Sequence, residues 1–243
     1  NALKFQKLKR SNIALEICNY FNIKLNKYQL KKTNFKKNKS NKISIFPIST
    51  SVIRSLPVKV VNEIILNFKE KYDIEIFIDN SDYSKHFLNE IYSNEIIVKN
   101  PTNIENLTKN ISKIEFGIFV DSGPLHLAKL FDKSGILIET SVSKNILLKD
   151  SQKIRAVRNI YKSNYCSGPC GLVDLFSFNQ KVGCYEIHKS AFDIIKNVKD
   201  PKKTHRWEKK ENNLYFMQNP VGCVKEINVD NVLKMINYKL KEI

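Results

Sequence analysis

Short apolar runs alternate with segments of helical periodicity along the middle of the chain. The apolar runs predict strands at 43–46, 74–78, 95–98, 115–120 and 135–138. Between the first four runs, apolar residues recur every three or four positions, which predicts helices at 57–72, 84–92 and 104–111. Strands that alternate with helices form parallel sheets with right-handed crossovers. We therefore predict an α/β fold, a Rossmann-like parallel sheet with helices on both faces.

The two flanks of this region have a looser pattern. Apolar spacing predicts helices at 11–21, 190–198 and 229–240, and a short strand at 154–157. The pattern divides the chain into an N-terminal helix with a basic linker (1–40), a Rossmann-like domain (41–198) and a C-terminal extension with a closing helix (199–243).

The residues after the run 115–120 are Asp121-Ser122-Gly123-Pro124-Leu125-His126-Leu127-Ala128. They predict a tight turn and then a helix, because Pro is favoured in a first helical turn, where no backbone donor is needed. The start of such a helix presents free N–H groups and the positive end of a dipole, which together bind anions. The alternative is an ordinary capped turn between a strand and a helix.

The loop after the first strand has a similar composition. Ser49 and Thr50 are followed by Arg54, and Pro57 then begins the next helix. Hydroxyl groups, backbone donors and a guanidinium group suit a diphosphate. Such loops are also common without a ligand. Because the carboxyl ends of parallel strands lie at one edge of a sheet, we expect this loop and the 121–126 turn to line one cleft.

The charge balance is strongly basic, with 41 Lys and Arg against 24 Asp and Glu and a net charge of +17. This balance fits phosphorylated substrates, an anionic membrane surface or nucleic acid. Lysines that are only solvated are the alternative, since Lys, Asn and Ile are frequent throughout. Nucleic acid is disfavoured, because only Tyr28 and Phe35 accompany the lysines of 26–42 as residues that stack on bases. No apolar run is long enough to span a membrane.

The chain has five cysteines and no secretory signal, which indicates reduced thiols in the cytoplasm. Cys166, Cys170, Cys184 and His188 have a spacing that tetrahedral zinc tolerates. Free structural thiols are the alternative. The spacing does not decide between a zinc site and structural thiols.

The Asp-Ser-Gly-Pro-Leu-His-Leu-Ala stretch resembles the signature of the heptosyltransferases, glycosyltransferase family nine: Asp-[Ser/Thr]-Gly-x-x-His-[Leu/Ile]-Ala. The loop after the first strand resembles the other nucleotide-sugar loop of that family. Ser49 and Thr50 match its hydroxyl residues, Arg54 stands where Lys is usual, and Leu56 replaces a Trp. The resemblance runs from about residue 43 to the end and implies the C-terminal, donor-binding half of a GT-B fold.

The resemblance also implies roles for single residues. Asp121 would contact the donor sugar and His126 would lie beside the diphosphate, so these two are the candidate catalytic residues. A carboxylate after the second strand would hold the ribose. Asp82 is our choice for it, with a solvated loop acid as the alternative. The remaining substrate-binding candidates are Ser49, Thr50, Arg54, Ser122, Gly123, Pro124 and Leu125.

The expected function is transfer of a sugar from a nucleotide diphosphate sugar, with ADP-heptose as the expected donor, to a bacterial lipopolysaccharide core. No metal or other cofactor is expected, because protein cations and a helix start would stabilise the departing diphosphate. The acceptor-binding domain of the family comes first in its chains, and nothing here matches it. We therefore expect a donor half that is inactive without that domain, cytoplasmic and in peripheral contact with the anionic inner membrane. The alternative is a non-catalytic module that binds nucleotides or nucleic acid.

Overall fold

The computed structural model describes residues 41–91, 96–148, 151–164, 166–171, 184, 186 and 216–243. The helices expected at 11–21 and 190–198, and His188, lie outside these residues.

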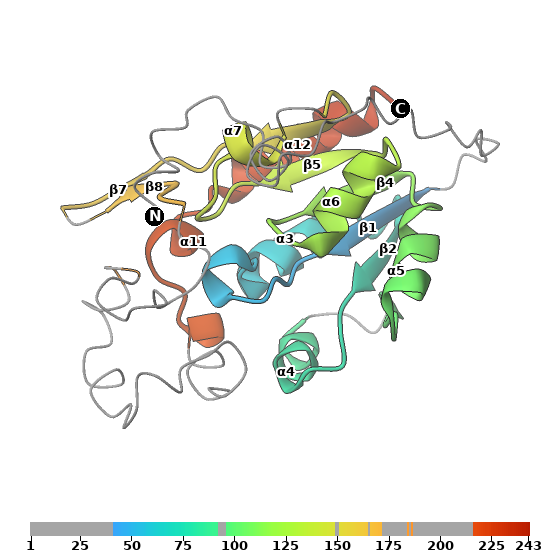
Figure 1. Ribbon diagram of the computed structural model, residues 1–243, viewed down its shortest axis with the longest axis horizontal. Coiled ribbons are helices and arrows are strands. Elements are labelled where there is room, and N and C mark those ends of the chain that lie inside the picture. The colour runs from blue at the N-terminus through green and yellow to red at the C-terminus, as the bar shows by residue number, and fades with distance from the viewer. Residues whose placement is uncertain are drawn as a thin grey trace, which may run out of the picture.

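Six strands form one sheet in which every neighbouring pair is parallel (Figure 1). They are β1 (Lys42–Phe46), β2 (Asp73–Phe77), β3 (Ile97–Lys99), β4 (Phe116–Phe119), β5 (Ser134–Ile138) and β6 (Ile154–Val157). The strand order is β3-β2-β1-β4-β5-β6. The order reverses between β1 and β4, which makes that point the place where such sheets bind ligands.

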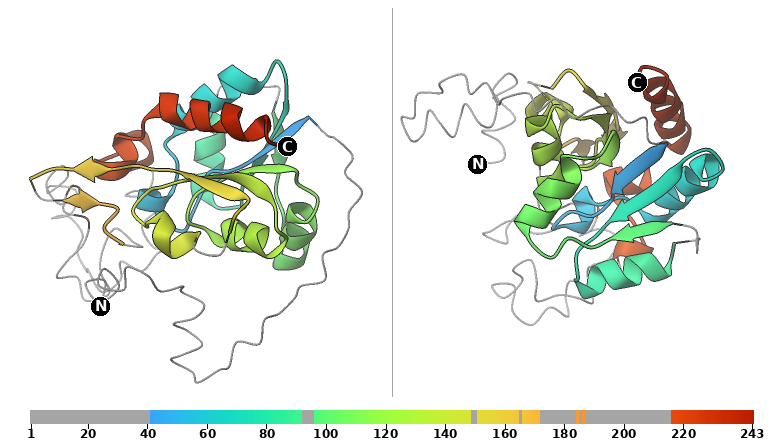
Figure 2. Two further views of the ribbon diagram at one scale, coloured as in Figure 1. Left: turned by 90° about the horizontal axis from the view of Figure 1, so that it is seen from above. Right: turned by 90° about the vertical axis from the view of Figure 1, so that its right-hand side faces the viewer.

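Helices cover both faces of the sheet, as predicted (Figure 2, left). On one face lie α3 (Val58–Phe68) and α12 (Val229–Leu240); on the other lie α5 (Ile104–Ile111), α6 (Gly123–Leu130) and α7 (Lys144–Leu147). A further helix, α4 (Asp82–Asn89), follows β2. The α/β fold class predicted from periodicity is therefore confirmed.

The closing helix expected at 229–240 packs onto the sheet. Val232 and Ile236 of α12 are fully buried in the same cluster as Ile43 and Ile45 of β1. They share a face because they are four residues apart on a helix. The domain boundary at residue 199 remains a prediction, although α12 belongs to the sheet's own helical layer.

The opposite face holds a row of stacked phenylalanines. Phe46 lies between Phe77 and Phe119, with ring centroids 4.5 Å and 5.1 Å away. The ring of Phe119 lies over Gly117 and Gly135: a Cβ added to Gly117 would come within 2.1 Å of Phe119 Cζ. Gly117 is therefore needed for the close approach of this ring, and Gly135 for the close approach of the Gly117 carbonyl, 2.1 Å from where its Cβ would be.

Several short elements were not predicted. They are η1 (Val52–Arg54), α7, the antiparallel hairpin β7 (Tyr161–Lys162) and β8 (Ser167–Gly168), and α11 (Gly222–Lys225). Each is too short for periodicity to appear in its sequence. Among the described helices, none has both the length and the apolar character that a bilayer crossing requires.

Candidate functional site

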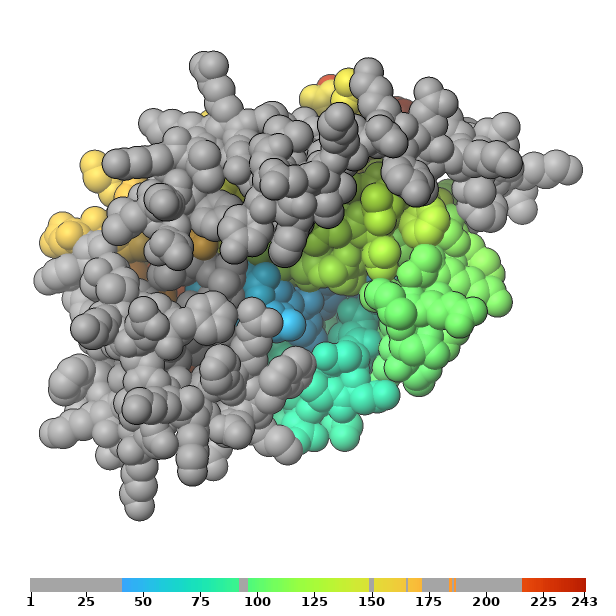
Figure 3. Space-filling view, in the orientation of Figure 1, coloured from blue at the N-terminus to red at the C-terminus, as the bar shows by residue number. Residues whose placement is uncertain are grey.

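A pocket of about 900 Å³ opens where β1, β2 and β4 end. Its lining comes from the three segments that follow these strands. On the face seen in Figure 3, the blue atoms around residue 50 lie between yellow-green atoms above and teal atoms below. The volume of this pocket is in the range of small-molecule sites, and the pocket lies at the switch point, where the strand order reverses between β1 and β4.

The segment after β1 turns sharply to bring Arg54 to the pocket. Val52 and Ile53 are buried and anchor the 3₁₀ turn η1, while Arg54, at its end, lines the pocket. Under this turn, Ser55 Oγ donates to Ser51 O (3.0 Å) and accepts from Ser49 N (3.0 Å). These bonds fix the backbone that carries the pocket hydroxyls.

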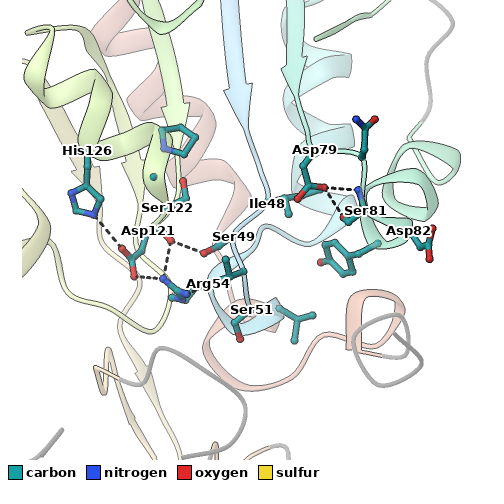
Figure 4. A pocket seen from close by; sticks show the side chains of 16 residues that line it. Ile48, Ser49, Ser51, Arg54, Asp79, Ser81, Asp82, Asp121, Ser122 and His126 are labelled. Atoms are coloured by element: carbon teal, nitrogen blue, oxygen red, sulfur yellow. Dashed lines mark hydrogen bonds and ion pairs between the residues drawn. The ribbon is translucent and has the colours of Figure 1, made fainter. Parts of the chain in front are cut away.

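Arg54 and Asp121 connect the two predicted loops. Arg54 Nη1 donates to Asp121 Oδ2 at 3.1 Å and to Asp121 O at 3.3 Å, and Nη2 donates to Thr50 Oγ1. Ser49 Oγ also donates to Asp121 O, at 2.8 Å. The loops after β1 and β4 are thus joined as one structure (Figure 4).

Two buried polar atoms of this pocket have no partner within the described part of the chain. They are Arg54 Nε and Ser51 Oγ, and both residues line the pocket. An unsatisfied buried polar group costs about 1–3 kcal/mol. Ser51 was not among the candidates, although it stands in the same Ser-Thr-Ser sequence.

The start of α6 is open to the pocket. Ser122 is the N-cap residue, but its Oγ donates to Val120 O (3.3 Å) and does not cap the helix. Pro124 has no N–H group, and a Cβ added to Gly123 would meet nothing within 4 Å. The space beside Gly123 is therefore free for an anion at the positive end of the helix dipole.

His126 lies in the first turn of α6, and its side chain approaches the carboxylate of Asp121 (Figure 4). Its Nε2 is 4.0 Å from Asp121 Oδ1, and its side chain is 44% exposed. Burial lowers the pKa of His126, Lys129 and Arg54 lower it further, and Asp121 acts in the opposite direction. His126 is therefore mostly neutral at pH 7 and would act as a hydrogen-bonding group.

Asp79 and Asp82 lie on the other side of the pocket (Figure 4). Asp79 Oδ1 accepts from Ser81 N (3.0 Å), Ser81 Oγ (2.6 Å) and Ser84 Oγ. Burial raises the pKa of Asp79, but these hydrogen bonds outweigh burial and lower it overall. Asp82 is 42% exposed and pairs with Lys85 at 3.6 Å. Asp79 is thus held in place by its hydrogen bonds, which also favour its ionised form.

Most of the predicted residues come together. Those that line the pocket are Ser49, Thr50, Arg54, Asp82, Asp121, Ser122, Gly123, Pro124 and His126. Leu125 does not line it. Its side chain is fully buried in the cluster that contains Phe46 and Phe119, because it faces the sheet from α6, and its N–H group bonds to Ser122 O. Asp79, at the other end of the segment 79–82 in which we expected the ribose carboxylate, lines the pocket as well as Asp82.

Four thiols gather away from this pocket. None of Cys166, Cys170, Cys184 and Cys223 forms a disulfide within the described part of the chain. Burial, together with the neighbouring Cys170 and Cys184, raises the pKa of Cys166 to about 11. Burial also raises the pKa of Cys223, with contributions from the other three. Among the described residues, no group of three or more His, Cys, Asp or Glu is arranged to hold a metal ion.

No protein-family model matches the chain, and no curated protein matches its sequence. Solved structures that it resembles are heptosyltransferases, the family that the two motifs resemble. With Escherichia coli ADP-heptose lipopolysaccharide heptosyltransferase II it shares 16% identity over 61% of this chain and 44% of that chain, with a TM-score of 0.41. With E. coli heptosyltransferase WaaC, solved with ADP-2-deoxy-2-fluoro heptose, it shares 15% identity over 52% and 39%, with a TM-score of 0.44.

The third structure is the iron-containing dodecameric glycosyltransferase TibC from enterotoxigenic E. coli. The identity is 14% over 82% of this chain and 45% of that chain, with a TM-score of 0.45. The chain spans less than half of the length of each of these three proteins.

Proposed function

We propose that the pocket at the β1–β4 switch point binds a nucleotide diphosphate sugar, and that the chain is the donor-binding part of a glycosyltransferase. One observation carries this proposal: Arg54, which bears a guanidinium group, and the hydroxyl residues Ser49, Thr50 and Ser51 line the same pocket. A diphosphate supplies acceptor oxygens and the negative charge that a guanidinium group binds well. The open start of α6 beside Gly123 adds a second anion-binding feature.

The two sides of the pocket suit the two ends of such a ligand. Arg54, Ser51 and Gly123 would hold the diphosphate. Asp79, on the other side, would accept hydrogen bonds from ribose hydroxyls through Oδ2, because its Oδ1 already accepts three bonds within its own loop. Ionised carboxylates are the usual ribose ligands after a strand of this fold. Asp82 would then be a solvated loop acid.

The proposed reaction is a direct displacement with inversion. An acceptor hydroxyl attacks the anomeric carbon, the bond from that carbon to the diphosphate oxygen breaks, and the hydroxyl proton passes to a base of the acceptor-binding domain. Arg54 and the start of α6 would stabilise the charge that develops on the diphosphate. His126 would donate a hydrogen bond there, and Asp121 would accept from a sugar hydroxyl while it orients Arg54. These groups would do this work without a metal ion.

The finer assignments rest on the motif resemblance. They are ADP-heptose as the donor, a lipopolysaccharide core as the acceptor, a separate N-terminal acceptor domain, and a cytoplasmic location in contact with the inner membrane. A nucleotide-binding module without chemistry is the alternative, and consumption of the donor distinguishes the two. A nucleic-acid site is disfavoured at this pocket, because the carboxylates of Asp79, Asp82 and Asp121 line it.

Calorimetric titration of the full chain with ADP, UDP and GDP tests the proposal, with Gly123→Val as the diagnostic variant. A valine side chain would fill the open space beside α6 without meeting protein atoms at its Cβ. The folded variant should therefore bind at least about tenfold more weakly, as expected for losing charge-assisted contacts worth about 1.5–3 kcal/mol, and its melting temperature is measured because a β-branched residue before Pro124 is disfavoured in a helix. Gly123→Ala should have a smaller effect. A wild-type chain that binds none of the three nucleotides would reject the proposal.

A further inference from the structure

His126 belongs to a row of charged and titratable side chains along one wall of the pocket. Arg54 Nη1 lies 3.1 Å from Asp121 Oδ2, and His126 Nε2 lies 4.0 Å from Asp121 Oδ1, so the carboxylate stands between the guanidinium group and the imidazole (Figure 4). All three residues line the pocket. The imidazole is the most exposed member of the row, so it is the member that a ligand in the pocket can approach most easily.

The charges around His126 disfavour its protonated form. Lys129 follows His126 by three residues, on the same side of α6, and its Nζ donates to Leu147 O at 2.6 Å. Two cations, Lys129 and Arg54, therefore act against one carboxylate, that of Asp121, which Arg54 already engages. Burial and the two cations lower the pKa of His126, and Asp121 opposes them without cancelling their effect.

The helices that pack beside α6 carry further charged residues. On α5, which contacts α6, and on α7, which shares its apolar cluster, these residues are Glu105, Lys109 and Lys144. Within the described part of the chain, the charged groups that act on His126 are the two cations and the carboxylate of the preceding paragraph. An anion that enters the pocket would therefore supply the counter-charge that a protonated imidazole lacks in the free chain.

We infer that His126 takes up a proton from the solvent when a nucleotide diphosphate binds, so that an imidazolium and a guanidinium group face the ligand together. The inference rests on the proposed function, which places the diphosphate beside Arg54 and the start of α6. His126 is in the first turn of that helix, so it would lie close to the same negative charges. An opposite charge within about 4–6 Å raises the pKa of a basic group by about 1–3. The proton returns to the solvent when the nucleotide leaves.

The test counts protons during binding to the full chain. The probe is ADP-glucose, or UDP-glucose or GDP-glucose if UDP or GDP is the nucleotide that binds. A nucleotide diphosphate sugar is suitable because it has no terminal phosphate, the group that titrates near about pH 6. Calorimetric titrations near neutral pH in Hepes and in Tris, which differ in ionisation enthalpy, give the number of protons taken up per ligand.

The wild type should show net proton uptake and a pH-dependent affinity. A group whose pKa is higher in the complex than in the free chain makes binding tighter as the pH falls through that range. We therefore expect the affinity to rise about tenfold or more from about pH 8 to about pH 5.5, since each unit by which binding raises the pKa changes the affinity tenfold.

His126→Gln removes the titration and keeps a hydrogen-bonding side chain that suits a helix. This variant should bind the probe without proton uptake, and its affinity should vary by less than about twofold over the same pH range. His86→Gln is the matched control, because His86 is an exposed histidine in the last turn of α4 and does not line the pocket. It should retain the proton uptake of the wild type.

Lys129→Gln tests the charges that keep His126 neutral, and it decides the question if His126→Gln does not fold. Removal of this cation raises the pKa of His126 with and without ligand, so the pH range in which the affinity rises should move upward. An unmoved range, no net proton uptake in the wild type, or full uptake in folded His126→Gln would overturn the inference and leave the proposed function standing. A wild-type chain that binds none of the nucleotides would reject the proposed function and this inference with it.

Discussion

Removal of the Arg54 side chain is the most informative change in the pocket. Arg54 makes the 3.1 Å ion pair with Asp121, contacts Thr50, and keeps one buried N–H group, Nε, without a partner in the described part of the chain. Arg54→Ala therefore deletes the donor that we assign to the diphosphate. It also leaves the Asp121 carboxylate, only 10% exposed, without its cation.

The expected loss has two parts. A charge-assisted hydrogen bond to a phosphate is worth about 1.5–3 kcal/mol, which corresponds to roughly a 10- to 150-fold rise in Kd. The uncompensated carboxylate of Asp121 then repels the ligand, which places the loss at the upper end of this range. Adding Asp121→Asn to Arg54→Ala removes that repulsion, so the double variant should bind ADP more tightly than Arg54→Ala alone.

The assay is calorimetric titration with ADP at fixed ionic strength. Arg155→Ala is the matched control, because Arg155 also pairs with a carboxylate at 3.1 Å, that of Glu242, but lies on β6 outside the pocket. This control should change ADP affinity by less than about twofold, as expected for a distant, screened charge. An Arg54→Ala protein that is folded and binds ADP as tightly as the wild type would refute the assignment of Arg54 to the diphosphate.

Three further predictions concern packing, acid stability and turnover. Gly117→Ala should lower the free energy of unfolding in urea by about 1–3 kcal/mol, because its Cβ would overlap the ring of Phe119. Gly123→Ala, with open space at its Cβ, is the control, and equal stability of the two variants would contradict the packing described. Because the folded-state pKa of Asp79 lies below its ordinary value of 3.8, Asp79 stabilises the fold above pH 3.8 and loses that contribution as the pH falls through the lowered value. Urea titrations from pH 5 downward should therefore show that the free energy of unfolding falls less steeply in Asp79→Asn than in the wild type. An equally steep fall in the two proteins would contradict this contribution of Asp79. Finally, the chain alone should bind the donor without transferring sugar, because the proposed base belongs to the acceptor-binding domain and general-base catalysis is worth about 10²–10⁴-fold. Donor consumption with a deacylated core acceptor, with and without an added N-terminal acceptor domain, measures this, and turnover by the chain alone would point to Asp121 or His126 as the base.

Periodicity alone gave most of the fold. The runs at 43–46, 115–120 and 135–138 correspond to β1, β4 and β5, and the closing helix at 229–240 coincides with α12. These elements were predictable because the spacing of their apolar residues can be read from the local sequence, and the same residues are buried in the core. Apolar spacing did not identify the buried face of α6. It selected Leu127, Leu130 and Phe131, but Leu130 is 57% exposed, and Leu125 and Ala128 are the residues that face the sheet.

The chain sequence also determined the chemistry of the two loops, since the hydroxyls, Arg54 and the Asp121–His126 turn are local in each. Only the tertiary structure decided how they meet. Arg54 and Asp121 are 67 residues apart, and they pair because β1 and β4 are neighbours at the point where the strand order reverses. Strand order depends on which crossovers pack best over the whole sheet, which no local pattern encodes. The hydrogen bonds that hold Asp79, and the donors of Ser51 and Arg54 that have no partner among the described residues, likewise depend on side-chain directions at distances of a few ångströms. These directions exist only once the three loops are packed against one another.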